Sequence, residues 1–138
     1  MYKKILYAVQ LDDANKLNIE KAIKYADTHN AMLHVVNVVS PLMPRYAYTG
    51  VYVEQEIQDG FTEGFRNLLR ESVRPHPHVT SEILLGEPAE IITDYADKND
   101  FDAILLNGHH HNIFGRFGSV AEKVVSMSKL DVIVFKEI

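Results

Sequence analysis

The segment of residues 107–119 combines glycines, histidines and the start of a helical pattern, and it points most directly to chemistry. Glycine lets a backbone approach a phosphate closely, and the free N–H groups at the start of a helix can hold the anion. Gly118 and Ser119 therefore form a candidate phosphate site. A simpler interpretation stays open, in which Gly118 only makes a turn and Ser119 caps its own helix in a capping box with Glu122.

Three consecutive histidines, His109 to His111, suggest a metal ion or a general base. Zinc sites usually draw their ligands from separated positions, and a second group orients each imidazole. No Asp or Glu adjoins the run, so we expect a polar loop at or near the surface. Arg116 in the same segment could pair with an anion, although an arginine facing solvent is the simpler expectation.

The other histidines also have two interpretations each. His76 and His78 flank Pro77, and Pro75 and Pro77 forbid a helix there, so we expect a turn with solvated side chains. His34 lies inside an apolar run, which favours a hydrogen-bonded core or interface histidine over a ligand.

Asp12 and Asp13 follow the first apolar run, where aspartates handle metals or phosphates in some α/β enzymes. Capping of the next helix and its dipole explain adjacent carboxylates equally well. The sequence has no Gly-x-Ser-x-Gly elbow, no P-loop lysine motif and no Gly-x-Gly-x-x-Gly after the first strand. We therefore expect no catalytic residue and no enzyme. A small hydrolase or transferase that uses Asp12 or a loop histidine remains an alternative.

Length and composition limit the classes of protein. The chain has 138 residues, which predicts one domain over residues 1–138. Its hydrophobic share of 46% and charged share of 24% are ordinary for a globular protein. A net charge of −5 argues against nucleic acid and against an anionic membrane surface. The absence of cysteine excludes disulfides and thiolate sites. No signal peptide is apparent, so we expect a cytoplasmic protein.

The elements that must position these residues alternate along the chain. Apolar runs typical of buried parallel strands cover residues 5–9, 33–39, 79–85, 101–106 and 132–135. Helical stripes lie between them, at residues 19–26, 53–69, 91–96 and 119–125. This alternation predicts a doubly wound, Rossmann-like or flavodoxin-like α/β domain. Such sheets bind ligands at the carboxyl ends of strands, here between strands one and four, where residues 10–13 and 107–119 meet.

Three stretches in order carry a family resemblance: residues 2–9, residues 86–92, and residues 108–111 followed by 118–124. They are similar to the opening strand, the turn after the third strand, and the signature loop with the last helix of the universal stress protein family. The resemblance runs from Tyr2 to the C-terminus. It implies a five-stranded parallel sheet of order 3-2-1-4-5 with four helices, a homodimer through the fifth strand, and a role in surviving stress.

The same resemblance implies a candidate nucleotide site. Ala8, Gln10 and Val38 would line an adenosine pocket. The phosphates would be held by a second group of residues, namely Gly108, Gly115, Gly118, Ser119 and Val120. ATP-binding members have a longer glycine-rich loop and an acidic residue where this chain has Gln10. Only nine residues separate Gly108 from Gly118, and His111 takes the place of a glycine, which is similar to the UspA-type branch that generally lacks ATP binding.

These features lead to two expectations. The last strand, Val132, Ile133, Val134 and Phe135, is apolar throughout yet lies at the sheet edge in the implied order, so a homodimer should cover it. ATP should bind weakly or not at all, and no cofactor is assigned. The leading interpretation is a stress-response dimer that acts on an unknown protein partner. An ATP- or AMP-binding regulatory module is the first alternative.

Overall fold

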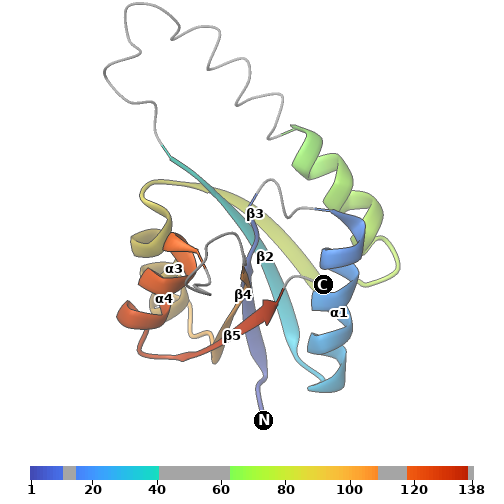
Figure 1. Ribbon diagram of the computed structural model, residues 1–138. Helices are drawn as coiled ribbons and strands as arrows, with labels where there is room; N and C mark the ends of the chain where they lie inside the picture. Colours follow the sequence, from blue (N-terminus) through green and yellow to red (C-terminus); the bar gives the residue numbers. More distant parts are fainter. Residues whose placement is uncertain (11–14, 41–62, 109–117, 137–138) are drawn as a thin grey trace, which may run out of the picture.

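The computed structural model describes residues 1–10, 15–40, 63–108 and 118–136 (Figure 1). Its elements in chain order are β1 (Lys4–Ala8), α1 (Lys16–Thr28), β2 (Met32–Val39), β3 (Val79–Leu85), α3 (Pro88–Lys98), β4 (Ala103–Gly108), α4 (Ser119–Met127) and β5 (Asp131–Lys136). Residues 63–73 form a further helix, drawn in green. It confirms the last part of the helix predicted at 53–69, and the first part lies outside the described residues.

The five strands form one parallel sheet of order β3-β2-β1-β4-β5, as the family resemblance implies. The central strand β1 pairs with β2 on one side and with β4 on the other, so Ile5 faces both Leu33 and Ala103. The α/β fold class is therefore confirmed. Strand β4 begins and ends two residues later than the predicted run of 101–106, and Phe101 lies buried just before it.

Alternate residues of the strands enter two separate hydrophobic cores, one on each face of the sheet. One core joins the sheet to α1 and to the helix of residues 63–73, through Ile19, Ile23, Phe65 and Leu69 among others. The other core joins it to α3 and α4, through residues that include Ile92 and Val124. Figure 1 shows these helix pairs on opposite sides of the sheet. Coverage of both faces explains why the central strands are apolar at nearly every position.

The start of α1 differs from the sequence prediction. Helix α1 is capped by Asn15, whose side chain accepts from the backbone N–H of Asn18 at 2.9 Å. The prediction that Asp12 or Asp13 caps this helix is therefore wrong, because the helix begins later, at Lys16. Both aspartates lie outside the described residues.

Helix α3 begins at Pro88, where the missing N–H of proline has no intrahelical role. Its N-cap is Glu87, whose carboxylate accepts from the N–H of Glu90 at 2.8 Å. Gly86, just before this cap, has a φ of +144°, which residues with a side chain rarely adopt. The turn between β3 and α3 therefore depends on this Gly-Glu-Pro sequence. Within the described parts of the chain, no helix has the length and apolarity needed to cross a membrane.

Candidate functional site

The predicted nucleotide site lies at the carboxyl ends of three neighbouring strands. Ala8 is the last residue of β1, Val38 is next to last in β2, and Gly108 is the last residue of β4. Ala8 pairs with Val36 of β2 and with Leu106 of β4, so Val38 and Gly108 each lie two residues beyond it toward the same edge of the sheet. The fold thus brings these three residues together as the sequence predicts.

Side-chain direction also agrees with a shared site. Ala8, Val38 and Val120 all belong to the hydrophobic core under α3 and α4, although Val38 and Val120 are only partly buried. Gln10 lies just past β1 and is exposed. Ala8, Val38 and Val120 therefore share the α4 side of the sheet, and the exposed amide of Gln10 lies just past the end of β1. Gly115, Arg116 and the run His109 to His111 lie outside the described residues.

Helix α4 starts at the same edge of the sheet. Gly118 is its N-cap, with φ 106° and ψ 156°, and the carbonyl of Gly118 accepts from the N–H of Glu122 at 3.0 Å. Ser119 is already the first helical residue. The predicted cap by Ser119 is therefore wrong, because the chain enters the helix one residue earlier than a Ser119 cap requires. Gly118 has no side chain that could cap the first N–H groups, and N–H groups at a helix start can bind an anion.

One charge opposes an anion there. Glu122 lies in the first turn of α4, where its carboxylate already interacts favourably with the positive end of the helix dipole. A bound phosphate would share that end of the helix with Glu122, and like charges repel. Among the described residues, the backbone at the start of α4 thus favours an anion, whereas the Glu122 carboxylate opposes one.

Two asparagines at this edge are functional candidates that the sequence reasoning missed. Asn107 accepts a hydrogen bond from the Tyr7 hydroxyl, and buried Asn37 donates from Nδ2 to the carbonyl of Val9 at 2.9 Å. Both lie on the α1 face of the sheet. The Oδ1 atom of Asn37 is buried, and no donor among the described residues reaches it. An asparagine inside an otherwise apolar strand is the signal that could have identified them.

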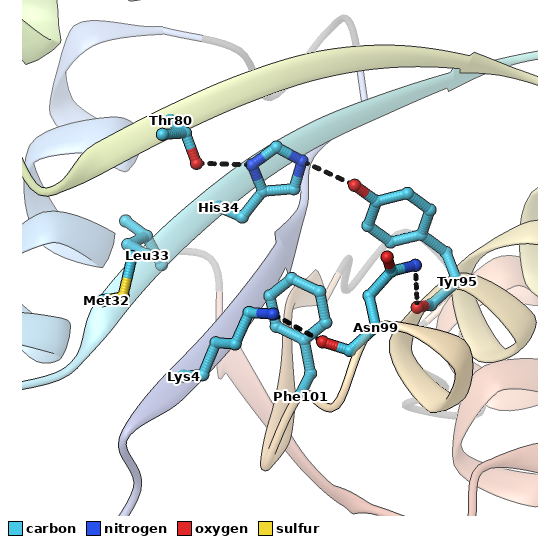
Figure 2. Close-up of a pocket in the computed structure, with 8 residues that line it drawn as sticks. All are labelled: Lys4, Met32, Leu33, His34, Thr80, Tyr95, Asn99 and Phe101. Carbon is cyan, nitrogen blue, oxygen red and sulfur yellow. Dashed lines mark hydrogen bonds between the residues drawn. The ribbon is translucent and has the colours of Figure 1, made fainter.

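A pocket of about 180 Å³ opens at the opposite, amino-terminal edge of the sheet (Figure 2). Its polar centre is His34 of β2. The Nδ1 atom of His34 lies 2.6 Å from the Thr80 hydroxyl, and its Nε2 atom lies 3.1 Å from the Tyr95 hydroxyl and 3.3 Å from Glu82. These contacts confirm the expectation that His34 is a hydrogen-bonded histidine.

The protonation state of Tyr95 in this cluster follows from its contacts. The Tyr95 hydroxyl donates to Glu82 at 2.7 Å, so it can only accept from His34. Burial, the hydrogen bond to Glu82 and the charge of Glu82 raise the pKa of Tyr95 to about 12. Tyr95 therefore stays a neutral donor at physiological pH. A tyrosine held in this way is a structural link between α3 and β3 rather than a base.

Aromatic contacts occupy the rest of the pocket wall. The ring of His34 stacks on that of Tyr95 with centroids 5.7 Å apart and an interplanar angle of 13°. Lys4 places its ammonium 4.4 Å from the centroid of the Phe101 ring and also donates to the carbonyl of Asn99. The groups that could bind a ligand here already bind one another. Figure 2 shows them converging from β1, β2, β3 and α3.

His76 and His78 are less solvated than the sequence predicts. Both are half-buried, and Nε2 of His78 lies 2.7 Å from Oδ1 of Asp27. A tertiary contact explains their burial, because the predicted turn of residues 74–78 packs against the last turn of α1. The turn itself is confirmed.

Comparison with known proteins decides the family. The sequence model of the Universal stress protein family matches residues 1–136. The chain belongs to the universal stress protein family. It is 26% identical over 136 residues to the universal stress protein A homolog of Haemophilus influenzae, covering 97% of this chain and 96% of that protein.

Solved universal stress proteins share the fold of this one. The structure of universal stress protein UspA from Lactobacillus plantarum has a TM-score of 0.77 and 27% identity, with 97% of each chain covered. A universal stress protein solved in complex with cAMP has a TM-score of 0.67 at 20% identity, covering 98% of this chain and 97% of that one. At that identity the second likeness shows the fold alone.

Proposed function

We propose that this universal stress protein is a cytoplasmic homodimer that acts in the stress response by binding a protein partner, and that it is not an enzyme. The observation that carries the proposal is the composition of the sheet edge at β5. Four successive apolar residues, Val132, Ile133, Val134 and Phe135, form this edge, and all are only partly buried.

Strand β5 pairs with β4 on one side, and among the described residues no strand pairs with its other side. Its side chains alternate between the two cores, with Ile133 and Phe135 on the α1 face and Val132 on the α4 face. An apolar edge with unpaired backbone groups is a template for another strand. A second copy of β5, antiparallel about a two-fold axis, would satisfy those groups and bury the exposed apolar surface.

Sedimentation velocity at micromolar concentration tests the dimer. We expect the wild type to sediment as a dimer and Ile133→Lys as a monomer, because the variant places a charge in the paired edge. Ser81→Lys is the matched control, since Ser81 is an exposed residue of the other edge strand, β3. It should leave the dimer intact. A monomeric wild type, or a dimeric Ile133→Lys variant, would contradict the proposal.

For nucleotides we propose weak ATP binding or none. The short spacing from Gly108 to Gly118 and the exposed Gln10 support this, and the carboxylate of Glu122 in the first turn of α4 adds repulsion. A helix N-terminus contributes roughly 0.3–1 kcal/mol to anion binding at an exposed site. Micromolar affinity needs about 8.2 kcal/mol, so the helix start alone is far too weak.

A regulatory ATP- or AMP-binding module is the second candidate function. The convergence of Ala8, Val38 and Gly108 with the start of α4 favours it, and a universal stress protein of the same fold has been solved with cAMP. Calorimetric titration with ATP and AMP separates the candidates. A dissociation constant tighter than about 10 μM that is lost in Gly118→Val would establish the nucleotide module instead.

The hydrolase or transferase alternative depends on Asp12 or a loop histidine, which the described residues do not include. Incubation with nucleotides and phosphoesters tests it. We expect no turnover above that of an Asp12→Asn variant. Turnover that this variant loses would make the protein an enzyme.

A further inference from the structure

We propose that Asp27, His76 and His78 bind one divalent transition-metal ion of the zinc type. Asp27 lies in the last turn of α1, and the two histidines lie in the turn that leads from the helix of residues 63–73 into β3. One carboxylate oxygen and one ring nitrogen from each histidine lie within 4.8 Å of one another. Imidazole nitrogen and carboxylate oxygen are both ordinary zinc ligands.

The spacing of these atoms is near that of a zinc site. Bonds of about 2.0–2.1 Å in a tetrahedral site place neighbouring ligand atoms about 3.3 Å apart. The distance from Nε2 of His78 to Oδ1 of Asp27 is 2.7 Å, which is shorter than this value. The three ligand atoms all lie within 4.8 Å of one another, a limit longer than this value. Small side-chain rotations therefore bring three ligands onto one ion. A fourth position would remain for water.

The backbone that carries the ligands is anchored on both sides. The N–H of His76 donates to Val73 at 2.7 Å, and the carbonyl of His76 accepts from Val79 at 3.1 Å. Pro77 fixes its own φ and restricts the backbone of the residue before it. The carbonyl of Asp27 accepts from Asn30 at 3.0 Å, where α1 ends. Little chain entropy remains to be lost when an ion binds, which favours affinity.

Electrostatics at the end of α1 also favour a cation. The last turn of α1 contains no basic residue, yet Asp27 adds a carboxylate to the negative end of the helix dipole. A divalent ion between Asp27 and the two histidines would offset both the carboxylate charge and the negative end of the helix dipole. The side chains of His78 and Asp27 are 38% and 45% exposed, so an ion can reach them from solvent.

The competing explanation is a simple hydrogen bond between His78 and Asp27, in which His76 has no part. His76 therefore provides the discriminating variant. Its ring contacts that of His78 at 5.9 Å and 87°, and the 2.7 Å contact between His78 and Asp27 does not involve it. His76→Asn should keep that contact and lose a metal ligand.

The experiment is calorimetric titration of the chelator-treated full chain with zinc chloride. All proteins carry the triple substitution His109→Asn, His110→Asn and His111→Asn, which removes the histidine run as a competing site. We expect one zinc ion per chain, at least tenfold weaker binding in His76→Asn, and unchanged binding in the matched control His29→Asn. His29 caps the same end of α1 but is not part of the cluster.

A second readout separates metal binding from folding. Zinc should raise the melting temperature of the triple variant, because a ligand that binds only the folded state stabilises it. Without zinc, His76→Asn should have the same melting temperature as the triple variant. With zinc, its melting temperature should rise by less. No zinc binding in the triple variant, or equal affinity in His76→Asn, would overturn the proposal.

Discussion

Gly64 and Gly86 show that the effect of one added methyl group on stability depends on its surroundings. A Cβ added to Gly64, in the helix of residues 63–73, would have no described atom within 4 Å apart from its chain neighbours and the backbone of its own helix. A Cβ added to Gly86 would lie 2.5 Å from Cγ1 of Ile91, on a backbone with φ +144°. The first glycine only weakens its helix, whereas the second is required by its turn.

We therefore expect Gly64→Ala to raise the free energy of unfolding by up to about 1 kcal/mol, because alanine has the better helix propensity. Gly86→Ala should lower it by more than about 1 kcal/mol, because the turn cannot accept a side chain without strain. Urea denaturation of both variants measures the difference. The same sign for both would contradict this assignment.

Tyr95 gives a pH dependence whose sign is fixed by its contacts. Its pKa is raised from 10.0 to about 12, so the folded state favours the protonated hydroxyl. The stability from this group is complete below pH 10 and is lost as pH rises toward 12. The difference in unfolding free energy between the wild type and Tyr95→Phe should therefore shrink across that range.

Absorbance of tyrosinate provides an independent check on Tyr95. Tyr95→Phe should remove a tyrosine that ionises near pH 12 rather than near pH 10. The Tyr2 pKa is also raised, by its hydrogen bond to Asp131, so Tyr2→Phe must be titrated beside it. If Tyr95→Phe removed a tyrosine that ionises at the ordinary pH, the hydrogen bond to Glu82 would be absent in solution.

At the scale of elements, Asn15 decides where α1 begins. We expect Asn15→Ala to lower the unfolding free energy by about 1 kcal/mol, because the N–H of Asn18 loses its acceptor. Asn15→Asp keeps an acceptor and should be close to the wild type. Thermal unfolding followed by circular dichroism measures both. An equal loss in the two variants would show that the cap is not the cause.

The strands were predictable from sequence, whereas the caps were not. Runs such as residues 5–9 are apolar because helices cover both faces, and that signal is local. Several neighbouring residues can cap a helix almost equally well, so sequence alone does not identify the cap. The observed caps, Asn15 and Gly118, lie one to three positions away from the predicted ones. Side-chain clusters were also missed. Asp27 meets His78 51 residues away, and no local pattern reports such a contact.

At the scale of the whole molecule, the two edges of the sheet differ in kind. In its first half, strand β3 exposes Thr80, Ser81 and Glu82 in succession, and a charged or polar edge resists pairing with another chain, although Leu85 at its end is also exposed. Strand β5 instead has four successive partly buried apolar residues, Val132 to Phe135, between exposed Asp131 and Lys136. This asymmetry favours a closed pair through one edge over an open chain of molecules through both.

A dimer through β5 makes stability depend on concentration. We expect the melting temperature of the wild type to rise with protein concentration, because association stabilises the folded state by mass action. Ile133→Lys should melt at a lower temperature that does not change with concentration. Differential scanning calorimetry over roughly a hundredfold range of protein concentration measures this dependence. A constant wild-type value would argue against the dimer.

The place of β1 in the sheet has a consequence for synthesis of the chain on the ribosome. Strand β1 is made first, and β2 soon follows as its first neighbour, yet its second neighbour β4 is made almost a hundred residues later, since Ile5 pairs with Ala103. Contacts between residues so far apart in sequence form slowly. The nascent chain therefore carries an apolar strand that is paired on one side only until β4 has been made. Chaperones that hold extended apolar segments should bind this protein during that interval and release it once β4 is added.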